Sequence, residues 1–356
     1  MLNHTIDVLP QNRLDEAALD AWLSAHVEGY GGGLQVRQFP GGYSNPTYAL
    51  EARMQDGTRR DLVLRKRPNG QLLPSAHRVD REFRVLRALA DTDVPVPRVH
   101  ALCEDPGVLG ASFFVMDHVP GRIFGDASMP GCTPAERDAV YGASIETLAR
   151  LHAVDPAAVG LADYGKPENF LGRLVERWIG QYRAAQTDDI PEMEQLAAWL
   201  QANLPAPQPA RIMHGDFRLG NLVIHPAEPR VMAVLDWELS TLGDPLCDVA
   251  YSCLAYHLHE SPIGWEDADW RGLGIPDEST QIRRYCALRG LDGIDHWDFY
   301  IAINIFKLAA IAQGAYKRAL DGTAPAAALS RKKNVLVRAR LALALVNRIE
   351  SATSTS

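Results

Sequence analysis

The chain has 356 residues, more than one ordinary hydrophobic core requires, so its length indicates two cores or lobes. Apolar residues make up 47% and charged residues 22%, a composition that excludes a largely disordered chain. The formal net charge of -8 argues against a general binder of nucleic acid or of anionic membranes, because such partners attract positive charge.

The start of the chain and its cysteines are typical of a cytoplasmic protein. The N-terminus lacks the basic start, apolar centre and small-residue cleavage site of a secretion signal. The long apolar stretch over 300–316 is interrupted by Lys307, so no membrane-spanning segment is expected. The five cysteines are odd in number and show no C-x-x-C spacing, which favours reduced, buried thiols.

The first part of the chain is predicted to contain one helix followed mainly by strands. Apolar residues at helical spacing define the first helix, and the glycines between 29 and 33 end it. Turn-rich segments over 40–46 and 54–58 separate three strand-like pieces, which favours a meander. The predicted elements are a helix over 13–27, strands over 34–39, 47–53 and 61–67, a helix over 75–92, and strands over 94–102 and 112–121.

The rest of the chain is predicted to be mainly helical. A strand-rich front and a helix-rich back indicate the α+β class with two lobes of unequal size. We expect an N-lobe over 1–116, a hinge over 117–121 and a helical C-lobe over 122–356. The helices are predicted over 136–154, 170–185, 191–204, 248–258, 298–320 and 331–350.

Two short motifs in the helical part carry chemistry. The first is "HGDFRLGN", residues 214–221, and the second is "VLDWE", residues 234–238. If 222–235 folds as two short antiparallel strands around the turn "HPAEP", then Asn221 and Asp236 converge. Their oxygens would suit Mg²⁺, which takes few protein ligands, and Asp216 would be left to accept a proton. This spacing indicates phosphoryl transfer.

The motifs resemble those of a known family. The pattern H-G-D-x-x-x-x-N followed by an Asp-Trp metal site resembles the aminoglycoside phosphotransferase and choline kinase branch of the kinase-like fold. Within that branch the chain is most similar to kinase-like domains fused to, or encoded beside, acyl-CoA dehydrogenases. The resemblance covers nearly the whole chain after the first helix. It implies a two-lobed kinase-like fold with a small antiparallel-sheet N-lobe, ATP and Mg²⁺ as cofactors, and a functional link to an acyl-CoA dehydrogenase.

The resemblance also implies a nucleotide site in the N-lobe. The hairpin "FPGGYSNPTYAL", residues 39–50, would cover the ATP phosphates. Gly41 and Gly42 would let the backbone approach closely, while Ser44 and Asn45 would point at phosphate oxygens. Without the downstream motifs the same residues would describe an ordinary tight hairpin.

A cation on the third strand would contact the phosphates. The family position is Arg65, which shares a strand face with Val63, and the valine would pack under adenine. Lys66 points the other way and is the alternative. Glu82, on the following helix, is expected to pair with Arg65 by analogy with the Lys–Glu pair of kinases, and its alternative is a solvated helix charge.

Further residues have roles that the resemblance implies. Adenine would lie at the hinge, flanked by Met116 and hydrogen-bonded to backbone from Asp117 to Val119. The remaining assignments are His152 as a packing histidine, His214 as a brace of its own loop, Asp248 as the anchor of that loop through backbone N–H groups, and Glu238 as an assistant in metal or acceptor binding.

The acceptor and two rival functions stay open. We expect a small-molecule hydroxyl acceptor, which the resemblance suggests is a hydroxyacyl compound or its CoA thioester; an aminoglycoside or choline-like alcohol is the alternative. Acidic residues over 259–270 would suit a polycationic aminoglycoside, whereas the tryptophans of the same segment have core packing as their alternative. The rivals are a metal-dependent hydrolase using His225, His257 and His259, and a catalytically silent binding module. No dinucleotide or Walker motif is present in the sequence.

Overall fold

The computed structural model describes residues 5–40, 45–68, 78–258 and 269–353, with side chains up to residue 347. Contacts divide the chain into two compact units, one over Met1–Arg122 and Leu222–Ser240, the other over Ile123–Asn221 and Thr241–Ser356. The prediction had assigned 222–240 to the C-lobe because the segment follows the hinge in chain order. Its contacts instead group it with the first unit, for example through the antiparallel bridge between Arg122 and Ile224.

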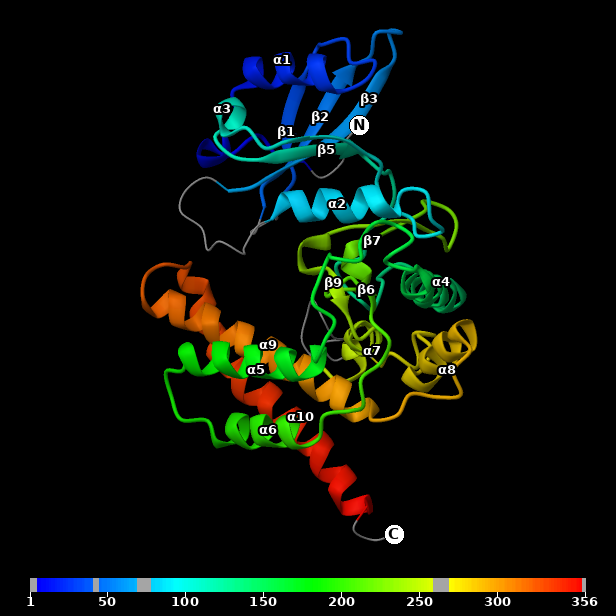
Figure 1. Cartoon of the computed structure of the whole chain (residues 1–356), viewed down its shortest axis with the longest axis vertical. Helices are drawn as coiled ribbons and strands as arrows, with labels where there is room; N and C mark the ends of the chain where they lie inside the picture. The colour runs from blue at the N-terminus through cyan, green and yellow to red at the C-terminus, as the bar shows by residue number, and fades with distance from the viewer. Residues whose placement is uncertain (1–4, 41–44, 69–77, 259–268, 354–356) are drawn as a thin grey trace. The chain divides into compact units, whose positions relative to one another are not determined.

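The first unit contains a five-stranded antiparallel sheet, ordered β1-β2-β3-β5-β4 (Figure 1). The three strands on one side form the predicted meander, because each pairs antiparallel with the next strand in the chain. The bounds of the strands are Gln35–Gln38 for β1, Thr47–Arg53 for β2, Arg59–Lys66 for β3, Val99–Cys103 for β4 and Phe113–Asp117 for β5.

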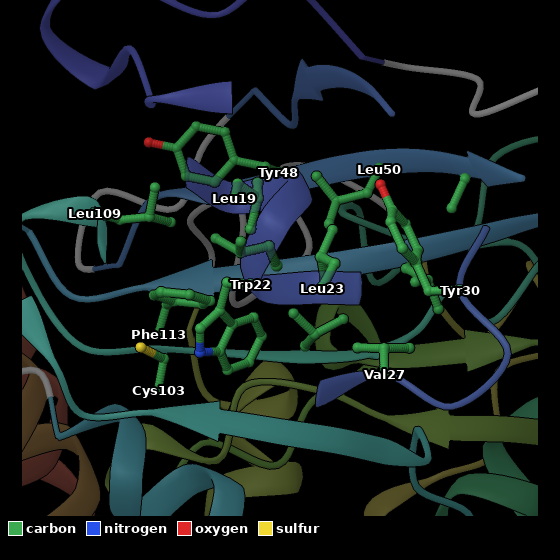
Figure 2. Packing of buried hydrophobic residues seen from close by; sticks show 14 residues of the cluster. Leu19, Trp22, Leu23, Val27, Tyr30, Tyr48, Leu50, Cys103, Leu109 and Phe113 are labelled. Carbon is green, nitrogen blue, oxygen red and sulfur yellow. The ribbon is translucent and has the colours of Figure 1, made fainter. Parts of the chain in front are cut away.

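One face of this sheet packs against helix α1 (Glu16–His26). Figure 2 shows the packing around Trp22, whose ring meets Phe113 edge to face with centroids 4.7 Å apart. Leu62 and Leu64 of β3 belong to the same buried cluster. Every second residue of β3 therefore faces α1, so Lys66 lies on the α1 side and Arg65 on the other.

The other face of the sheet carries α2 (Val79–Leu89) and an apolar row. α2 buries Val79, Glu82, Val85, Leu86 and Leu89 on one face. Across the strands, Ala49, Val63, Met116 and Val99 lie opposite one another in register. The short helix α3 (Pro106–Leu109) was not predicted.

The segment after residue 221 forms the predicted pair of short strands, β7 (Leu222–Ile224) and β8 (Val231–Val234). The end of the hinge lies against β7, and Gly121 is required there. A Cβ atom at Gly121 would come within 2.4 Å of Val223 and 2.6 Å of the Ile224 carbonyl oxygen. The single-turn helix η3 (Trp237–Leu239) follows Asp236, which has a left-handed backbone with φ of 65°.

The second unit is mainly helical, which confirms the α+β class. Its strands β6 (Arg211–Met213) and β9 (Thr241–Gly243) pair on either side of the inserted 222–240 segment. Helix α8 was missed because its sequence is mostly polar and exposed. The helices are α4 (Pro134–Ala153), α5 (Phe170–Ala184), α6 (Pro191–Ala202), α7 (Leu246–Ser252), α8 (Glu278–Arg289), α9 (Trp297–Leu320) and α10 (Lys332–Thr353).

Helix α9 has the length and composition of a membrane-spanning helix, yet 78% of its most apolar window is buried inside the protein. Its buried residues include Phe299, Ile303 and Phe306. A core helix of a globular protein passes the same test of length and composition, and this burial is typical of one.

Candidate functional site

Arg65, near the end of β3, is surrounded by carboxylates of the first unit. Its Nε lies 2.7 Å from Oε2 of Glu82, and its Nη2 lies 2.6 Å from Oδ1 of Asp236. Glu238 is more distant, with Oε2 3.8 Å from Nη2. The Arg65 Nε–H group is not aligned with Glu82 as a hydrogen bond, so charge holds this contact. The structure thus contains the predicted pair of Arg65 and Glu82 and adds two carboxylates to it.

Burial and charge oppose each other in this cluster. Glu82 is 2% exposed, and burial raises its pKa to about 7 against the attraction of Arg65. Burial alone would lower the pKa of Arg65, but the carboxylates of Glu82 and Asp236 raise it above its ordinary value. One guanidinium faces three carboxylates, so the cluster keeps a net negative charge when all are ionised and attracts a further cation.

Lys66, the alternative phosphate contact, lies on the opposite face of β3. It is 3% exposed and lines a pocket with Asn12, Arg13 and Tyr48 on the α1 side of the sheet. Burial lowers the pKa of Lys66. Within the first unit, Arg65 is therefore the one of the two cations that shares a sheet face with Val63 and α2.

The predicted phosphate-covering hairpin is only partly described. Gly41, Gly42 and Ser44 lie outside the described residues. Asn45 is 1% exposed, and its Nδ2 lies 3.5 Å from Oε2 of Glu238. Its Oδ1 is buried and has no hydrogen-bond partner among the residues that the structure describes. An amide with an unsatisfied polar atom beside the Arg65 cluster fits a position that awaits a ligand.

The predicted adenine edge of the sheet has fewer backbone donors than expected. The N–H of Asp117 donates to the Arg98 carbonyl at 2.8 Å, and that of His118 donates to Asp61 at 3.1 Å. These sheet bonds occupy both donors, so Asp117 N–H is not available to adenine. The N–H of Val119 has no acceptor within the described part of the chain, which makes it the donor that fits the predicted role. Met116 is 8% exposed and lies opposite Val63.

In the second unit, Asp248 of α7 binds the backbone of the loop 214–221, here called the HGD loop. Its Oδ2 accepts from the N–H of His214 at 2.5 Å, and its Oδ1 accepts from Gly215 at 2.8 Å. Burial alone would raise the pKa of Asp248, but the His152 and His214 rings and the Gly215 N–H lower it below its ordinary value. The predicted anchor of the HGD loop backbone is present.

Asp216 is held from two sides within the HGD loop. Nδ2 of Asn221 donates to both the backbone oxygen and Oδ2 of Asp216, each at 2.8 Å. Nε of Arg218 lies 3.5 Å from the same Oδ2. Because the amide nitrogen of Asn221 faces Asp216, its amide oxygen faces away and is the atom suited to a metal ion. Asp236, the other predicted ligand, belongs to the first unit.

His152 of α4 and His214 of the HGD loop behave as structural residues. His152 is fully buried, with Nδ1 2.8 Å from the Tyr285 hydroxyl and Nε2 3.6 Å from Oδ2 of Asp248. His214 Nδ1 accepts the N–H of Asp216 at 3.2 Å, so this ring braces its own loop as predicted. Gly215 has a φ of 84°, a left-handed conformation that explains why glycine stands between His214 and Asp216.

Comparison of the sequence with known protein families identifies the family of this chain. The model of the phosphotransferase enzyme family matches residues 35–313. The chain belongs to that family. Acyl-CoA dehydrogenase family member 10 of Mus musculus is 49% identical to this phosphotransferase over 322 residues, which cover 90% of the chain and 29% of the relative. The chain therefore spans less than a third of that relative's length.

Structural comparisons confirm the kinase-like fold of the phosphotransferase. A candidate aminoglycoside phosphotransferase from Ralstonia eutropha aligns with a TM-score of 0.83 at 43% identity, covering 94% of this chain and 99% of that chain. An aminoglycoside phosphotransferase solved in a ternary complex with AMP-PNP and hygromycin B aligns with a TM-score of 0.58 at 17% identity, covering 93% and 98%. The second likeness concerns the fold alone.

A pocket in the second unit opens beside Asp216. It encloses about 400 Å³, including space open to solvent. Tyr251 lines it, and burial together with hydrogen bonding to Asp216 raises the Tyr251 pKa well above its ordinary value. None of the described residues that line this pocket carries a carboxylate. They are Phe124, Ala127, Tyr141, Arg218, Leu219, Gly220, Tyr251, Ser252 and Ala255.

The hydrolase alternative finds little support in the geometry. His257 lies 2.7 Å from Glu278 and His225 contacts the backbone of Ala227, while His259 lies outside the described residues. Among the residues that the structure describes, no three His, Cys, Asp or Glu side chains gather as a metal site.

The sequence analysis did not identify Tyr251 and Lys307 as residues near Asp216. A lysine in the middle of an apolar helix, as at Lys307, could have indicated a functional contact.

Replacing Asp248 with alanine should destabilise the phosphotransferase strongly. Asp248→Ala leaves two buried backbone donors without acceptors, so we expect the free energy of unfolding to fall by about 3–5 kcal/mol. Urea denaturation measures the change. The control is Asp138→Ala on α4, where a half-exposed carboxylate pairs with Arg284 at 2.9 Å and the loss should stay below about 1 kcal/mol. Similar losses in both variants would contradict the anchor.

Proposed function

We propose that this chain is an ATP- and Mg²⁺-dependent kinase that transfers the γ-phosphoryl group to a hydroxyl of a small molecule. The observation that carries the proposal is the HGD loop, in which Asn221 and the Asp248 anchor fix Asp216 beside an open pocket. Asp216 is the catalytic residue and accepts the proton of the acceptor hydroxyl. Phosphoryl transfer needs little more than such positioning and charge neutralisation.

The nucleotide is held mainly by the first unit. Arg65 orients the phosphates while Glu82 holds the guanidinium, and Asn45 contributes with the covering hairpin. Adenine lies on the apolar row that contains Val63 and Met116 and accepts a hydrogen bond from Val119. Membership of the phosphotransferase enzyme family supports ATP as the phosphoryl donor.

Magnesium is assigned to Asn221 and Asp236. The net negative charge around Arg65 fits a divalent ion, because Asp236 and Glu238 outnumber the positive charge that they face. Mg²⁺ needs only one or two protein oxygens and takes its other ligands from water and phosphate. Bound metal would neutralise charge on the transferring phosphoryl group.

The acceptor is a hydroxylated acyl compound or its CoA thioester. The pocket beside Asp216 combines aromatic and apolar residues with Arg218 and lacks a carboxylate among its described lining, which suits a chain with an anionic or neutral end. The name of the mouse relative supports a functional link to an acyl-CoA dehydrogenase. An aminoglycoside or choline-like alcohol is the second candidate, favoured by the likeness to the Ralstonia protein.

A panel of acceptors should separate these candidates. We expect phosphate transfer from ATP to hydroxyacyl-CoAs or free hydroxy acids, because Arg218 attracts an anionic end. Choline-like alcohols, sugars and aminoglycosides should be poor acceptors. The measurement is ATP-dependent phosphorylation of each compound, detected by mass spectrometry. Phosphorylation of the cationic compounds alone would assign the chain to the second candidate.

Replacing Asp216 with asparagine should remove turnover and spare nucleotide binding. Asp216→Asn keeps the shape of the side chain but cannot accept the proton, so we expect kcat to fall by about 10²–10⁴-fold. The ATP dissociation constant should change by less than about twofold, since nucleotide contacts lie elsewhere. The matched control is Asp155→Asn, an exposed aspartate of the same unit. Unchanged activity in Asp216→Asn would remove this residue from the mechanism.

Substitutions on β3 should identify the phosphate contact. Arg65→Met should raise the ATP dissociation constant by about tenfold or more, because a guanidinium–phosphate contact is lost. Lys66→Met should leave it within about twofold, and calorimetric titration measures both. If Arg65→Met does not fold, the double variant Arg65→Met, Glu82→Leu removes the buried charges together. The opposite pattern would assign the contact to Lys66.

A further inference from the structure

Helix α9 presents polar side chains to the backbone that carries Asp216. Tyr300, Asn304 and Lys307 recur at helical spacing, so they lie along one face of an otherwise apolar helix. Tyr300 donates its hydroxyl to Oδ2 of Asp244 at 2.9 Å, and Nδ2 of Asn304 donates to the Cys247 carbonyl at 2.9 Å. These two contacts tie α9 to the segment around α7.

Lys307 extends this row to the HGD loop itself. Its Nζ donates to the carbonyl oxygen of Gly215 at 2.7 Å and lies 4.5 Å from the ring centroid of Tyr251. In the part of the chain that the structure describes, no carboxylate comes within 4 Å of this ammonium. Burial lowers the pKa of Lys307, and the charges of Asp216 and Asp248 oppose that shift. A partly buried lysine without an ion pair gives up hydration without a compensating charge, which indicates that its position serves another purpose.

The contact completes a set of restraints on successive peptide groups. Asp248 holds the N–H groups of His214 and Gly215. The next peptide joins Gly215 to Asp216, and it is held at both ends, by Lys307 at its C=O and by His214 Nδ1 at its N–H. Gly215 is one of two glycines in the loop and has a left-handed backbone, so an additional restraint at this peptide limits a position with unusual backbone freedom.

We propose that Lys307 is a positioning residue for phosphoryl transfer, which fixes the peptide between Gly215 and Asp216 and so aims the Asp216 carboxylate at the acceptor. The inference rests on the proposed function for its catalytic consequence. A second route reinforces it, because Lys307 lies over the ring of Tyr251 and the Tyr251 hydroxyl hydrogen-bonds Asp216. Loss of the ammonium would loosen the Gly215–Asp216 peptide and the Tyr251 contact, while Asn221 and Arg218 would still hold the carboxylate.

The kinetic test compares the same substitution at two places on α9. Lys307→Met keeps the length and apolar stem but removes the donor, and we expect kcat to fall by about 10–100-fold with the ATP KM within about twofold. The control is Lys317→Met, where the half-exposed lysine pairs with Asp321 at 2.6 Å and activity should be unchanged. Lys307→Arg keeps a charged donor and should recover part of the rate. Equal kcat in Lys307→Met and the parent would overturn the inference.

A second readout does not depend on the acceptor. Hydrogen exchange of a peptide spanning 211–221 should become faster in Lys307→Met and stay unchanged in Lys317→Met, because only the first variant frees the loop. Faster exchange with no phosphotransfer in any variant would support the restraint and reject the proposed function. Unchanged exchange in Lys307→Met would reject the restraint. If Lys307→Met does not fold, Lys307→Leu, which likewise has no donor, takes its place in both measurements.

Discussion

The carboxylate of Asp248 is the constraint on which the catalytic half of this protein depends. A buried negative charge is tolerable only where donors surround it, and here the donors are the backbone N–H groups of His214 and Gly215. The same hydrogen bonds that satisfy the charge also determine the path of the HGD loop. Stability and catalytic geometry therefore share one interaction, which explains why an aspartate in the first turn of a short helix matters so much to residues more than thirty positions earlier.

Arg65 has the corresponding organising role in the first unit. Here a cation positions carboxylates, whereas Asp248 is an anion that binds backbone N–H donors. A cation at the end of β3 gathers Glu82 from α2 and Asp236 from the segment after β8. The arginine does not neutralise its surroundings, because Glu238 adds a third carboxylate. A cluster with excess negative charge is better suited to receiving a cation than to a purely structural role, since a bound divalent ion would balance the charge. The HGD loop depends on hydrogen bonds that fix its backbone. The Arg65 cluster instead carries excess negative charge, which a bound cation would balance.

Much of this could be read from the sequence, and the failures have a common cause. Alternation and turn residues predicted β1 to β3, and the motif spacing predicted the strand pair after Asn221, because both depend on local chemistry. The assignment of 222–240 to the helical lobe failed because its partners, such as Arg122, are distant in the chain. Asp117 appeared to offer a backbone donor because its pairing with Arg98 cannot be read locally. Lys307 was read only as an interruption of an apolar helix, since its acceptor lies 92 residues away.

These long-range contacts also show how the site is prepared for chemistry. Each unit satisfies the charges of its own functional residues with its own elements: β3, α2 and η3 around Arg65, and α7, α9 and the HGD loop around Asp216. The polar groups are thus oriented by helices and strands that are themselves held by apolar cores, as in the α1 face of the sheet. Groups oriented before the substrate arrives need little reorganisation when charge develops in the transition state, and this is where a preorganised site gains its rate. For a reaction that depends mostly on positioning, the buried anchors therefore contribute as directly as the residues that touch the reacting atoms.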